Sequence, residues 1–346
     1  MLENEILINE DNLIYNYQYY KNLANKEIIA VLKANAYGHG LVQIARILDS
    51  INVYMIAVSN IQEGIHLRQN GIRSKILILE PIEVKDMLNC YYYHLIPVIS
   101  SLTQFKKLNN AKFFTTLPIH LEIDSGMHRS GITIDEAKII KEMNQSNSNL
   151  IIKGLFSHLI GNELEEGFIN KQKEYFRKII NLFNDDSLCI HLSSTSFIEN
   201  DIKESNAIRI GLGLYGLKDD KNTKQVLSLR SPIINACNIS KGEYSSYDNS
   251  FKAKQDGYIY TIPMGYHHGL LLKYKLSPSI DDKRLFVAGR KCMNQTLLFS
   301  KNQYFIGEMV DLINEKNTLL SLAKRSNVSI YELISLLNTN IKRIIV

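Results

Sequence analysis

The sequence has no tryptophan and only four cysteines, Cys90, Cys189, Cys237 and Cys292, in its 346 residues. The cysteines lie far apart and form no Cys-x-x-Cys pair. The chain therefore lacks the spacing that is typical of a zinc site or of a disulfide framework. We expect reduced thiols and no bound metal.

Long apolar runs are also absent, since no uncharged apolar stretch reaches the length that crosses a bilayer. The N-terminal segment MLENEILINEDN is acidic, and no apolar run follows a positive segment there. No signal peptide is predicted, and we expect a cytoplasmic protein that does not enter a membrane.

Runs of one charge are missing as well. The net charge is +5, but lysine and arginine are scattered and form no basic stripe with interleaved aromatic residues. Nucleic-acid binding is therefore not expected. A modest positive surplus favours small anionic ligands instead.

Eight short apolar runs alternate with amphipathic segments in the first two thirds of the chain. A doubly wound open sheet can produce such alternation, but a count of eight favours a closed (β/α)8 barrel. The candidate strands are 28–33, 53–59, 75–81, 94–100, 119–124, 151–159, 188–194 and 207–211.

The pattern changes after Gly216. Short strand-like runs separated by Gly, Asp, Asn and Lys follow, which predicts a smaller β-rich domain. The segment SIYELISLLN predicts a helix near the end, and IKRIIV predicts a closing strand. We predict a barrel domain over residues 1–226 and a β-rich domain over 227–346.

Polar residues follow several of the predicted barrel strands at the point where each strand ends. In a parallel barrel these ends face one shared opening, so their side chains should converge there. The positions are Lys33, 124–129, His158, Ser194 with Thr195, and Arg209 with Gly211.

The run VLKANAYGHG at 31–40 resembles the cofactor attachment motif of alanine racemases, which use pyridoxal 5'-phosphate. Further matching runs extend over nearly the whole chain. They are IHLEIDSGMHRSGI (119–132), GLFSHL (154–159), HLSST (191–195), IRIGLGLYG (208–216), IPMGYHHG (262–269) and GRKCMNQ (289–295).

The resemblance implies a racemase that moves the Cα proton of a small amino acid with two bases. Lys33 would hold the cofactor and serve one face of the substrate, and Tyr266 of a partner subunit would serve the other. Two acid/base groups on opposite faces are what this reaction requires. The resemblance also implies a homodimer with shared active sites and D-alanine supply for peptidoglycan.

The resemblance assigns the remaining site residues as well. Arg209 would meet the pyridine nitrogen and His158 would pack beside the cofactor ring. Arg129 and the backbone N–H of Met293 would bind the substrate carboxylate. The phosphate group would be bound by backbone donors and hydroxyls, namely those of Tyr37, Ser194, Thr195, Gly211 and Leu212.

Some positions depart from the family pattern. Glu122 stands where the family commonly has a carbamylated lysine, and we predict that it orients Arg129 directly. The usual Gly-Tyr-Ala-Asp-Gly reads Gly-Tyr-His-His-Gly at 265–269, and Asn294 replaces an aspartate. These changes concern the substrate entrance and the dimer contact more than cofactor binding.

Three other functions stay open from the sequence. The chain could racemise another amino acid, such as serine or one with a longer side chain, because a few pocket contacts decide the substrate. It could also be a catalytically silent homologue that binds the cofactor. A decarboxylase with a similar barrel fits the motifs less well.

Overall fold

The computed structural model describes residues 2–111, 114–146, 148–161, 166–337 and 339–346. The chain divides into two compact units. The barrel unit comprises Tyr17–Ala34 and Ile44–Leu214, and the β unit comprises Met1–Asn16, Asn35–Gln43 and Tyr215–Val346. The domain division at residues 226 and 227 stays a prediction.

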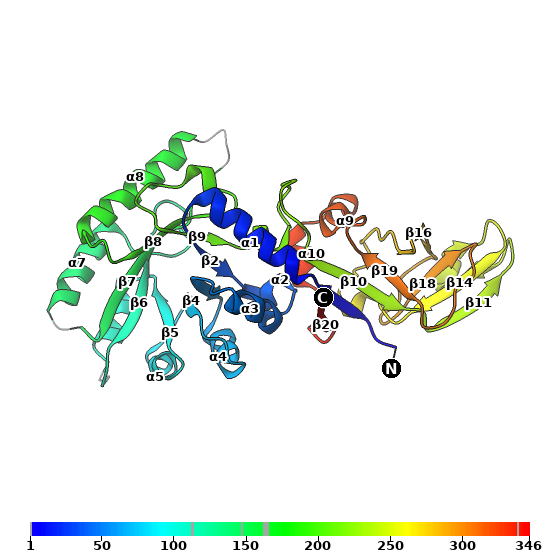
Figure 1. The fold of residues 1–346 in the computed structure, drawn as a ribbon, viewed down its shortest axis with the longest axis horizontal. Coiled ribbons are helices and arrows are strands. Elements are labelled where there is room, and N and C mark those ends of the chain that lie inside the picture. The colour runs from blue at the N-terminus through cyan, green and yellow to red at the C-terminus, as the bar shows by residue number, and fades with distance from the viewer. Residues whose placement is uncertain (1, 112–113, 147, 162–165, 338) are drawn as a thin grey trace. The chain divides into compact units, whose positions relative to one another are not determined.

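Eight parallel strands form a closed barrel in the barrel unit, which confirms the predicted fold class (Figure 1). β9 closes the ring by pairing with β2, where Ile208 lies opposite Ile28. The strands are β2 (Glu27–Val31), β3 (Met55–Val58), β4 (Lys75–Pro81), β5 (Leu95–Ile99), β6 (Leu117–Glu122), β7 (Leu150–Phe156), β8 (Cys189–Ser194) and β9 (Ala207–Ile210).

The barrel strands are mainly apolar along their length because both of their faces are covered. Ile56 and Ala57, which are neighbours on β3 and point to opposite faces, are both fully buried. The same holds for Ile76 and Leu77 on β4. This is why the sequence shows runs rather than strict alternation.

The helices begin where the sequence provides capping residues. At the start of α7, the Thr133 side chain accepts a hydrogen bond from the Glu136 N–H, and the Glu136 carboxylate accepts one from the Thr133 N–H. The helices that the structure describes between Glu10 and Tyr215 are α1 (Glu10–Ala24), α2 (Lys33–Tyr37), α3 (Leu41–Ser50), α4 (Ile61–Gln69), η1 (Val84–Asp86), α5 (Met87–Tyr92), α6 (Leu102–Asn109), α7 (Ile134–Gln145), α8 (Glu166–Phe183), η3 (Ile198–Asn200) and η4 (Leu212–Tyr215).

The described residues of the β unit form three sheets, and the largest has the strand order β16-β15-β19-β10-β1-β20. β1 (Glu5–Ile8) pairs antiparallel with β10 and parallel with β20. The predicted closing strand and final helix are confirmed as β20 (Lys342–Ile345) and α10 (Ile330–Ser335). The strand β1 was not predicted from the sequence.

A second sheet, of order β11-β14-β18-β17, packs around an apolar cluster of the β unit. The cluster consists of Ile239, Ala253, Ile259, Ala288 and Phe299. The remaining elements of this part of the chain are β10 (Leu227–Pro232), β11 (Asn235–Ile239), β12 (Tyr244–Ser245), η5 (Tyr247–Asn249), β13 (Phe251–Lys252), β14 (Gly257–Ile262), η6 (Tyr266–His268), β15 (Ser279–Ile280), β16 (Lys283–Arg284), β17 (Phe286–Val287), β18 (Thr296–Ser300), β19 (Met309–Ile313) and α9 (Leu319–Ser326).

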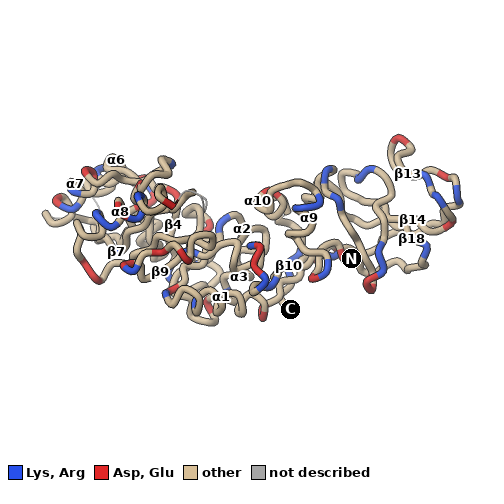
Figure 2. The backbone as a smooth tube through the Cα atoms, turned by 90° about the horizontal axis from the view of Figure 1, so that it is seen from above, with Lys and Arg blue, Asp and Glu red and all other residues tan. Residues whose placement is uncertain are grey.

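Charged residues of both signs are interspersed along the backbone of each unit (Figure 2). This agrees with the scattered charge of the sequence. Among the helices that the structure describes, none combines the length and the apolar character needed to cross a bilayer.

Candidate active site

A left-handed turn follows the first barrel strand and begins with Lys33. The residues 34–37 have φ values from 51° to 56°, a region that L-amino acids avoid at a cost of roughly 1–2 kcal/mol each. Hydrogen bonds hold the turn: the side chain of Asn35 accepts from the Leu41 N–H at 2.8 Å, and its carbonyl oxygen accepts from the Gly40 N–H at 3.0 Å. Strained backbone of this kind is typical of functional sites.

The ammonium group of Lys33 is electrostatically destabilised. Partial desolvation and the positive charge of Arg129 lower the pKa of Lys33 below its ordinary value. A lower pKa increases the fraction of neutral amine, which is the form that attacks an electrophile or accepts a proton.

Arg209 lies buried at the end of β9, with 5% of its surface exposed. Its Nη1 donates to Nδ1 of His191 at 2.8 Å and to the carbonyl oxygen of His191 at 2.9 Å. Its Nη2 donates to the carbonyl oxygens of Ser157 and Leu192 at 2.7 and 3.0 Å. Nη2 also lies 3.3 Å from Nδ1 of His158. The guanidinium is therefore fixed by β8 and by the residues that directly follow β7.

The charge of Arg209 survives this burial. Desolvation lowers its pKa to about 10, and the negative charge of Glu122 opposes the shift. The group thus stays protonated at neutral pH. Its hydrogen bonds to described residues use the terminal nitrogens, so Nε–H is the donor that remains for a ligand.

Two buried histidines extend from Arg209 into the barrel. A guanidinium can only donate, so Nδ1 of His191 accepts and the ring proton lies on Nε2. Nε2 of His191 lies 3.0 Å from Nδ1 of His120, which in turn accepts and carries its own proton on Nε2. Burial lowers the pKa of His120 to about 3 and that of His191 well below its ordinary value, so both rings are neutral.

The same histidines form, with Cys189, a group whose potential metal-ligand atoms lie within 4.8 Å of one another. A metal would need an unprotonated ring nitrogen from His191. Its Nδ1 faces Arg209 and its Nε2 carries a proton, and burial raises the pKa of the Cys189 thiol. The tautomers set by Arg209 make this group a hydrogen-bond relay instead of a cation site.

His158 follows β7 and lies among positive charges. Burial, followed by the charges of Arg209, Arg129 and Lys33, lowers the pKa of His158 to about 3. Residues predicted from four different strand ends therefore lie within electrostatic range of one another. The ring of His158 is neutral at physiological pH.

Glu122 ends β6 and is buried, whereas the Arg129 side chain in the following loop is 57% exposed. Glu122 Oε1 lies 3.7 Å from Arg129 Nη2, which is an ion pair too long for a hydrogen bond. Asp124 orders the loop by accepting from the N–H groups of Gly126 and His128, each at 3.0 Å.

The segments that follow β8 and β9 meet through one hydrogen bond. The Gly211 N–H donates to Oγ1 of Thr195 at 3.2 Å. Ser194 ends β8 and lies opposite Arg209 in the strand register. Leu212 begins η4, and N–H groups at the start of a helix have no partner within it.

Tyr37, Tyr266 and Met293 belong to the β unit. Tyr37 is 8% exposed, its ring lies 5.3 Å from that of Tyr215, and burial raises its pKa. Nδ1 of His39 lies 2.9 Å from the carbonyl oxygen of Tyr37, so this nitrogen carries the proton and donates. The end of the left-handed turn is thus enclosed by aromatic rings.

The turn that carries Tyr266 is fixed to the segment that carries Met293. The N–H of Tyr266 donates to the carbonyl oxygen of Cys292 at 3.2 Å, and that of His267 to the carbonyl oxygen of Met293 at 2.9 Å. Gly265 permits this contact, since a Cβ there would lie 2.3 Å from the Cys292 oxygen. Two residues predicted from separate motifs therefore share one small surface.

His268 stands where the family usually has aspartate, and it performs a capping role. Its Nδ1 accepts a hydrogen bond from the Gly265 N–H at 3.2 Å. An aspartate oxygen at this place would accept in the same way. Desolvation and the neighbouring His267 lower the pKa of His268, which preserves the unprotonated form that can accept.

Sequence reasoning assigned no role to His120 and His191. Both lie inside short apolar strands, in the runs IHLE and CIHLS. A polar residue flanked by apolar neighbours in a strand that is covered on both faces must be buried with a partner. This signal was present in the sequence, but the identity of the partner was not.

Comparison with known proteins gives a consistent result. Residues 8–219 match the family model described as alanine racemase, N-terminal domain, and residues 226–345 match the one described as alanine racemase, C-terminal domain. The alanine racemase of Fusobacterium nucleatum subsp. nucleatum is 34% identical over 361 residues, which cover 99% of this chain and 99% of that protein.

Two further relatives cover at least 99% of the chain. A solved structure of alanine racemase from Clostridium difficile superposes with a TM-score of 0.91 at 26% identity, covering 100% of this chain and 96% of that one. A protein of Oenococcus oeni named lysine racemase is 29% identical over 371 residues, covering 99% of this chain and 97% of that protein.

Proposed function

The chain belongs to the alanine racemase family, and from that premise we propose that Lys33 and Tyr266 interconvert L- and D-alanine as two bases. Alanine racemisation is the activity that the relatives support best. The observation that carries the proposal is the position of Lys33 close to Arg129, Arg209 and His158. The positive charges of Lys33, Arg129 and Arg209 all lower the pKa of His158. We further propose that the D-alanine serves peptidoglycan synthesis in the cytoplasm.

The residues at this end of the barrel fit pyridoxal 5'-phosphate. Lys33 provides an amine with a lowered pKa for covalent attachment. Thr195 and Gly211, joined by a hydrogen bond, would contribute a hydroxyl and a backbone donor to a phosphate group, and the resemblance adds Ser194, Leu212 and the hydroxyl of Tyr37. The cofactor, when bound, withdraws electrons from the substrate Cα and so makes its proton removable.

Arg209 limits how strongly the cofactor ring can withdraw electrons. Its Nε–H is the donor available to a ring nitrogen, and a guanidinium with a pKa of about 10 does not transfer its proton at neutral pH. A ring nitrogen at this donor would therefore receive a hydrogen bond without becoming protonated. His158, held neutral beside Arg209, would pack next to the ring without adding a further positive charge.

Proton transfer requires one group on each face of the substrate Cα. Lys33 accepts or returns the proton on one face, and its lowered pKa keeps a neutral fraction available for this. Tyr266, with 38% of its surface exposed, acts on the other face from a partner subunit. Because two backbone hydrogen bonds, from Tyr266 to Cys292 and from His267 to Met293, join the turn of Tyr266 to the segment of Met293, both residues would enter the partner's site together.

The substrate carboxylate is bound by Arg129 through a charge-assisted hydrogen bond and by the backbone N–H of Met293. Glu122 lies 3.7 Å from Arg129 and supplies the negative charge that a carbamylated lysine would otherwise provide. The exposed guanidinium keeps donors for the substrate while Glu122 limits its movement.

A racemase for another amino acid is the second candidate. The observation that favours it is the full-length similarity to a protein named lysine racemase. Since one or two contacts can change the accepted side chain, the shared motifs do not decide between the two substrates.

The test is racemisation of L-alanine by the purified protein with added cofactor. Lys33→Ala and Tyr266→Phe should each reduce the rate roughly 10²–10⁴-fold, because each removes one of the two bases. Tyr247→Phe, at another exposed tyrosine of the β unit, is the matched control and should retain activity. Activity should also fall on dilution as the dimer dissociates.

Turnover of lysine, serine or another amino acid but not of alanine would assign the second candidate. Cofactor attachment to Lys33 without turnover of any amino acid would show a silent homologue. Full activity of Tyr266→Phe would contradict the two-base mechanism.

A further inference from the structure

A cavity of about 550 Å³ opens at the opposite end of the barrel from Lys33. Its wall is formed by the first residues of five barrel strands, which are Met55, Lys75, Leu95, Leu117 and Cys189. Catalytic groups of such barrels lie at the C-terminal ends of the strands, so this cavity is separate from the candidate active site.

The cavity is positively charged. Lys75 and Lys153 line it, and no aspartate or glutamate is among its described lining residues. Lys75 Nζ lies 4.8 Å from the centre of the Tyr54 ring, another lining residue, in a cation–π contact. Asp185 is near enough to sense the charge of Lys153, but it does not line the cavity. The lining therefore offers cations and an aromatic face.

A buried donor also points toward this space. His120 is 1% exposed and lines the cavity. Its Nδ1 is occupied by the hydrogen bond from His191, which leaves the proton on Nε2. Because the ring lines the cavity, this N–H can donate to a molecule bound there.

We propose that this cavity binds a small organic anion, a carboxylate or a phosphate ester, through Lys75, Lys153 and the Nε2–H of His120. Two ammonium groups neutralise the charge, and the imidazole N–H supplies a directional hydrogen bond. The ring of Tyr54 provides an apolar surface for the rest of the ligand.

The bound anion also affects Arg209 through three hydrogen bonds that run in one direction. Arg209 donates to His191, His191 donates to His120, and His120 donates to the anion. Each acceptor in such a chain becomes a stronger acceptor when its own N–H is engaged, so the bonds strengthen one another. The anion therefore tightens the contact that holds Arg209.

The first experiment measures binding of benzoate and, separately, of inorganic phosphate to the cofactor-loaded protein by titration calorimetry. Excess alanine is present so that Arg129 is occupied by a carboxylate. We expect one anion per chain, with the dissociation constant raised about tenfold or more in Lys75→Met/Lys153→Met because two charged donors are lost.

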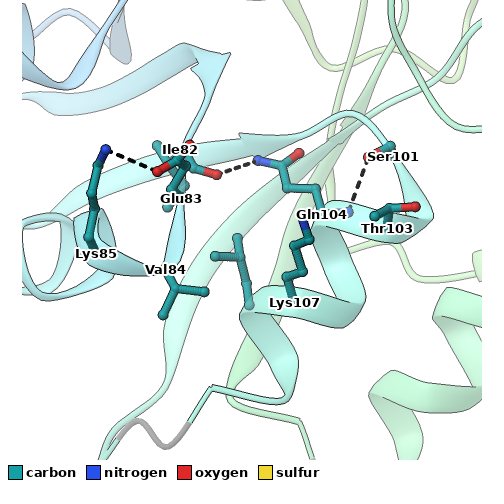
Figure 3. Close-up of a pocket in the computed structure, with 9 residues that line it drawn as sticks. Ile82, Glu83, Val84, Lys85, Ser101, Thr103, Gln104 and Lys107 are labelled. Carbon is teal, nitrogen blue, oxygen red and sulfur yellow. Dashed lines mark hydrogen bonds and ion pairs between the residues drawn. The ribbon is translucent and has the colours of Figure 1, made fainter.

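A second cavity of the barrel unit, of about 470 Å³, provides the matched control (Figure 3). Lys85 and Lys107 line it, and Lys85 forms an ion pair of 3.0 Å with Glu83. The variant Lys85→Met/Lys107→Met removes the same amount of charge and should bind the anion like the wild type. Absence of saturable binding, or equal weakening in both double variants, overturns the site.

The coupling to Arg209 has its own readout. Nitrogen-15 NMR of the histidine rings should show shifts of His120 and His191 on anion binding in the wild type, and no shift of His191 in His120→Leu. A loaded cavity with an unchanged His191 signal overturns the coupling. These measurements need no turnover, so they hold or fail independently of the proposed racemase activity.

Discussion

The two halves of the barrel bury different kinds of residue. In β2 to β5, the strand residues that are fully covered are all apolar, as in Ile56 and Leu77. In β6, β8 and β9 the strands bury His120, His191 and Arg209, each with at most 5% of its surface exposed. One half is an ordinary close-packed core, and the other contains a connected polar network.

The difference separates burial that close packing explains from burial that requires polar partners. Burying a charge and two imidazoles is unfavourable unless every polar atom finds a partner, and apolar residues of similar size would pack at least as well. The polar half keeps these groups in fixed tautomers and orientations, with Arg209 at one end of the network and the cavity at the other. We therefore expect a substitution in the polar network to reduce both stability and activity, and a substitution in the apolar core to reduce stability alone.

The largest effect is expected for Arg209→Met. The substitution leaves the carbonyl oxygens of Ser157, His191 and Leu192 buried without their donor. Breaking a buried charged network in this way costs about 3–5 kcal/mol. We expect a loss of that size in the free energy of unfolding, measured with urea, together with a loss of racemase activity of at least about a hundredfold.

Ile56→Ala is the matched variant in the apolar half. It should destabilise by a similar amount, about 2–5 kcal/mol, because it creates a cavity in the core. The turnover of the folded enzyme should stay near that of the wild type. Equal losses of turnover in both variants would show that the two halves do not differ in function.

The next largest effect is expected from low pH, which should lower the stability of the protein through the two buried histidines of the polar half. The pKa of His120 is about 3 and that of His191 is well below its ordinary value, whereas an unfolded histidine has a pKa of about 6.5. Below pH 6.5 the unfolded chain therefore binds protons that the folded chain does not. The free energy of unfolding should fall with decreasing pH, by up to about 1.4 kcal/mol per pH unit for each of these histidines.

Urea unfolding of wild type and His120→Gln at pH 7, 6 and 5 checks this expectation. The variant has one titrating group fewer in the network, so its stability should depend less on pH by about one proton. Identical pH dependence of the two proteins would mean that His120 is not held neutral in the folded state.

The barrel strands of both halves were predicted from the sequence. Each is a short run of mostly apolar residues, such as KILILEP, and all eight are present in the closed barrel. Strand β1 escaped prediction because its partners β10 and β20 are more than 200 residues away in the sequence. Pairing at that distance leaves no local pattern.

The sequence indicated single residues of the candidate site but not the hydrogen bonds that join them. Strand-end position and motif resemblance pointed to Lys33, His158 and Arg209. The relay through His191 and His120 depends on which ring nitrogen faces which neighbour, and that is decided by three-dimensional packing. The left-handed turn after Lys33 was likewise not predicted. Its residues are alanine, asparagine and tyrosine, which indicate positive φ far less clearly than glycine does.

The left-handed turn after β2 begins with Lys33, the proposed catalytic residue of the apolar half. The smallest predicted effect is that of Ala34→Gly in this turn. Ala34 is exposed and has φ of 53°, so glycine relieves about 1–2 kcal/mol of strain while losing about 0.5–1 kcal/mol through backbone entropy. We expect stability to be unchanged or raised by up to about 1 kcal/mol in urea unfolding. Ala137→Gly in the right-handed helix α7 should instead destabilise by at least about 1 kcal/mol, because helix propensity falls and a buried methyl group is lost. If both substitutions destabilise equally, the left-handed turn stores no strain. The backbone that positions Lys33 would then cost no more conformational free energy than the backbone of the core strands.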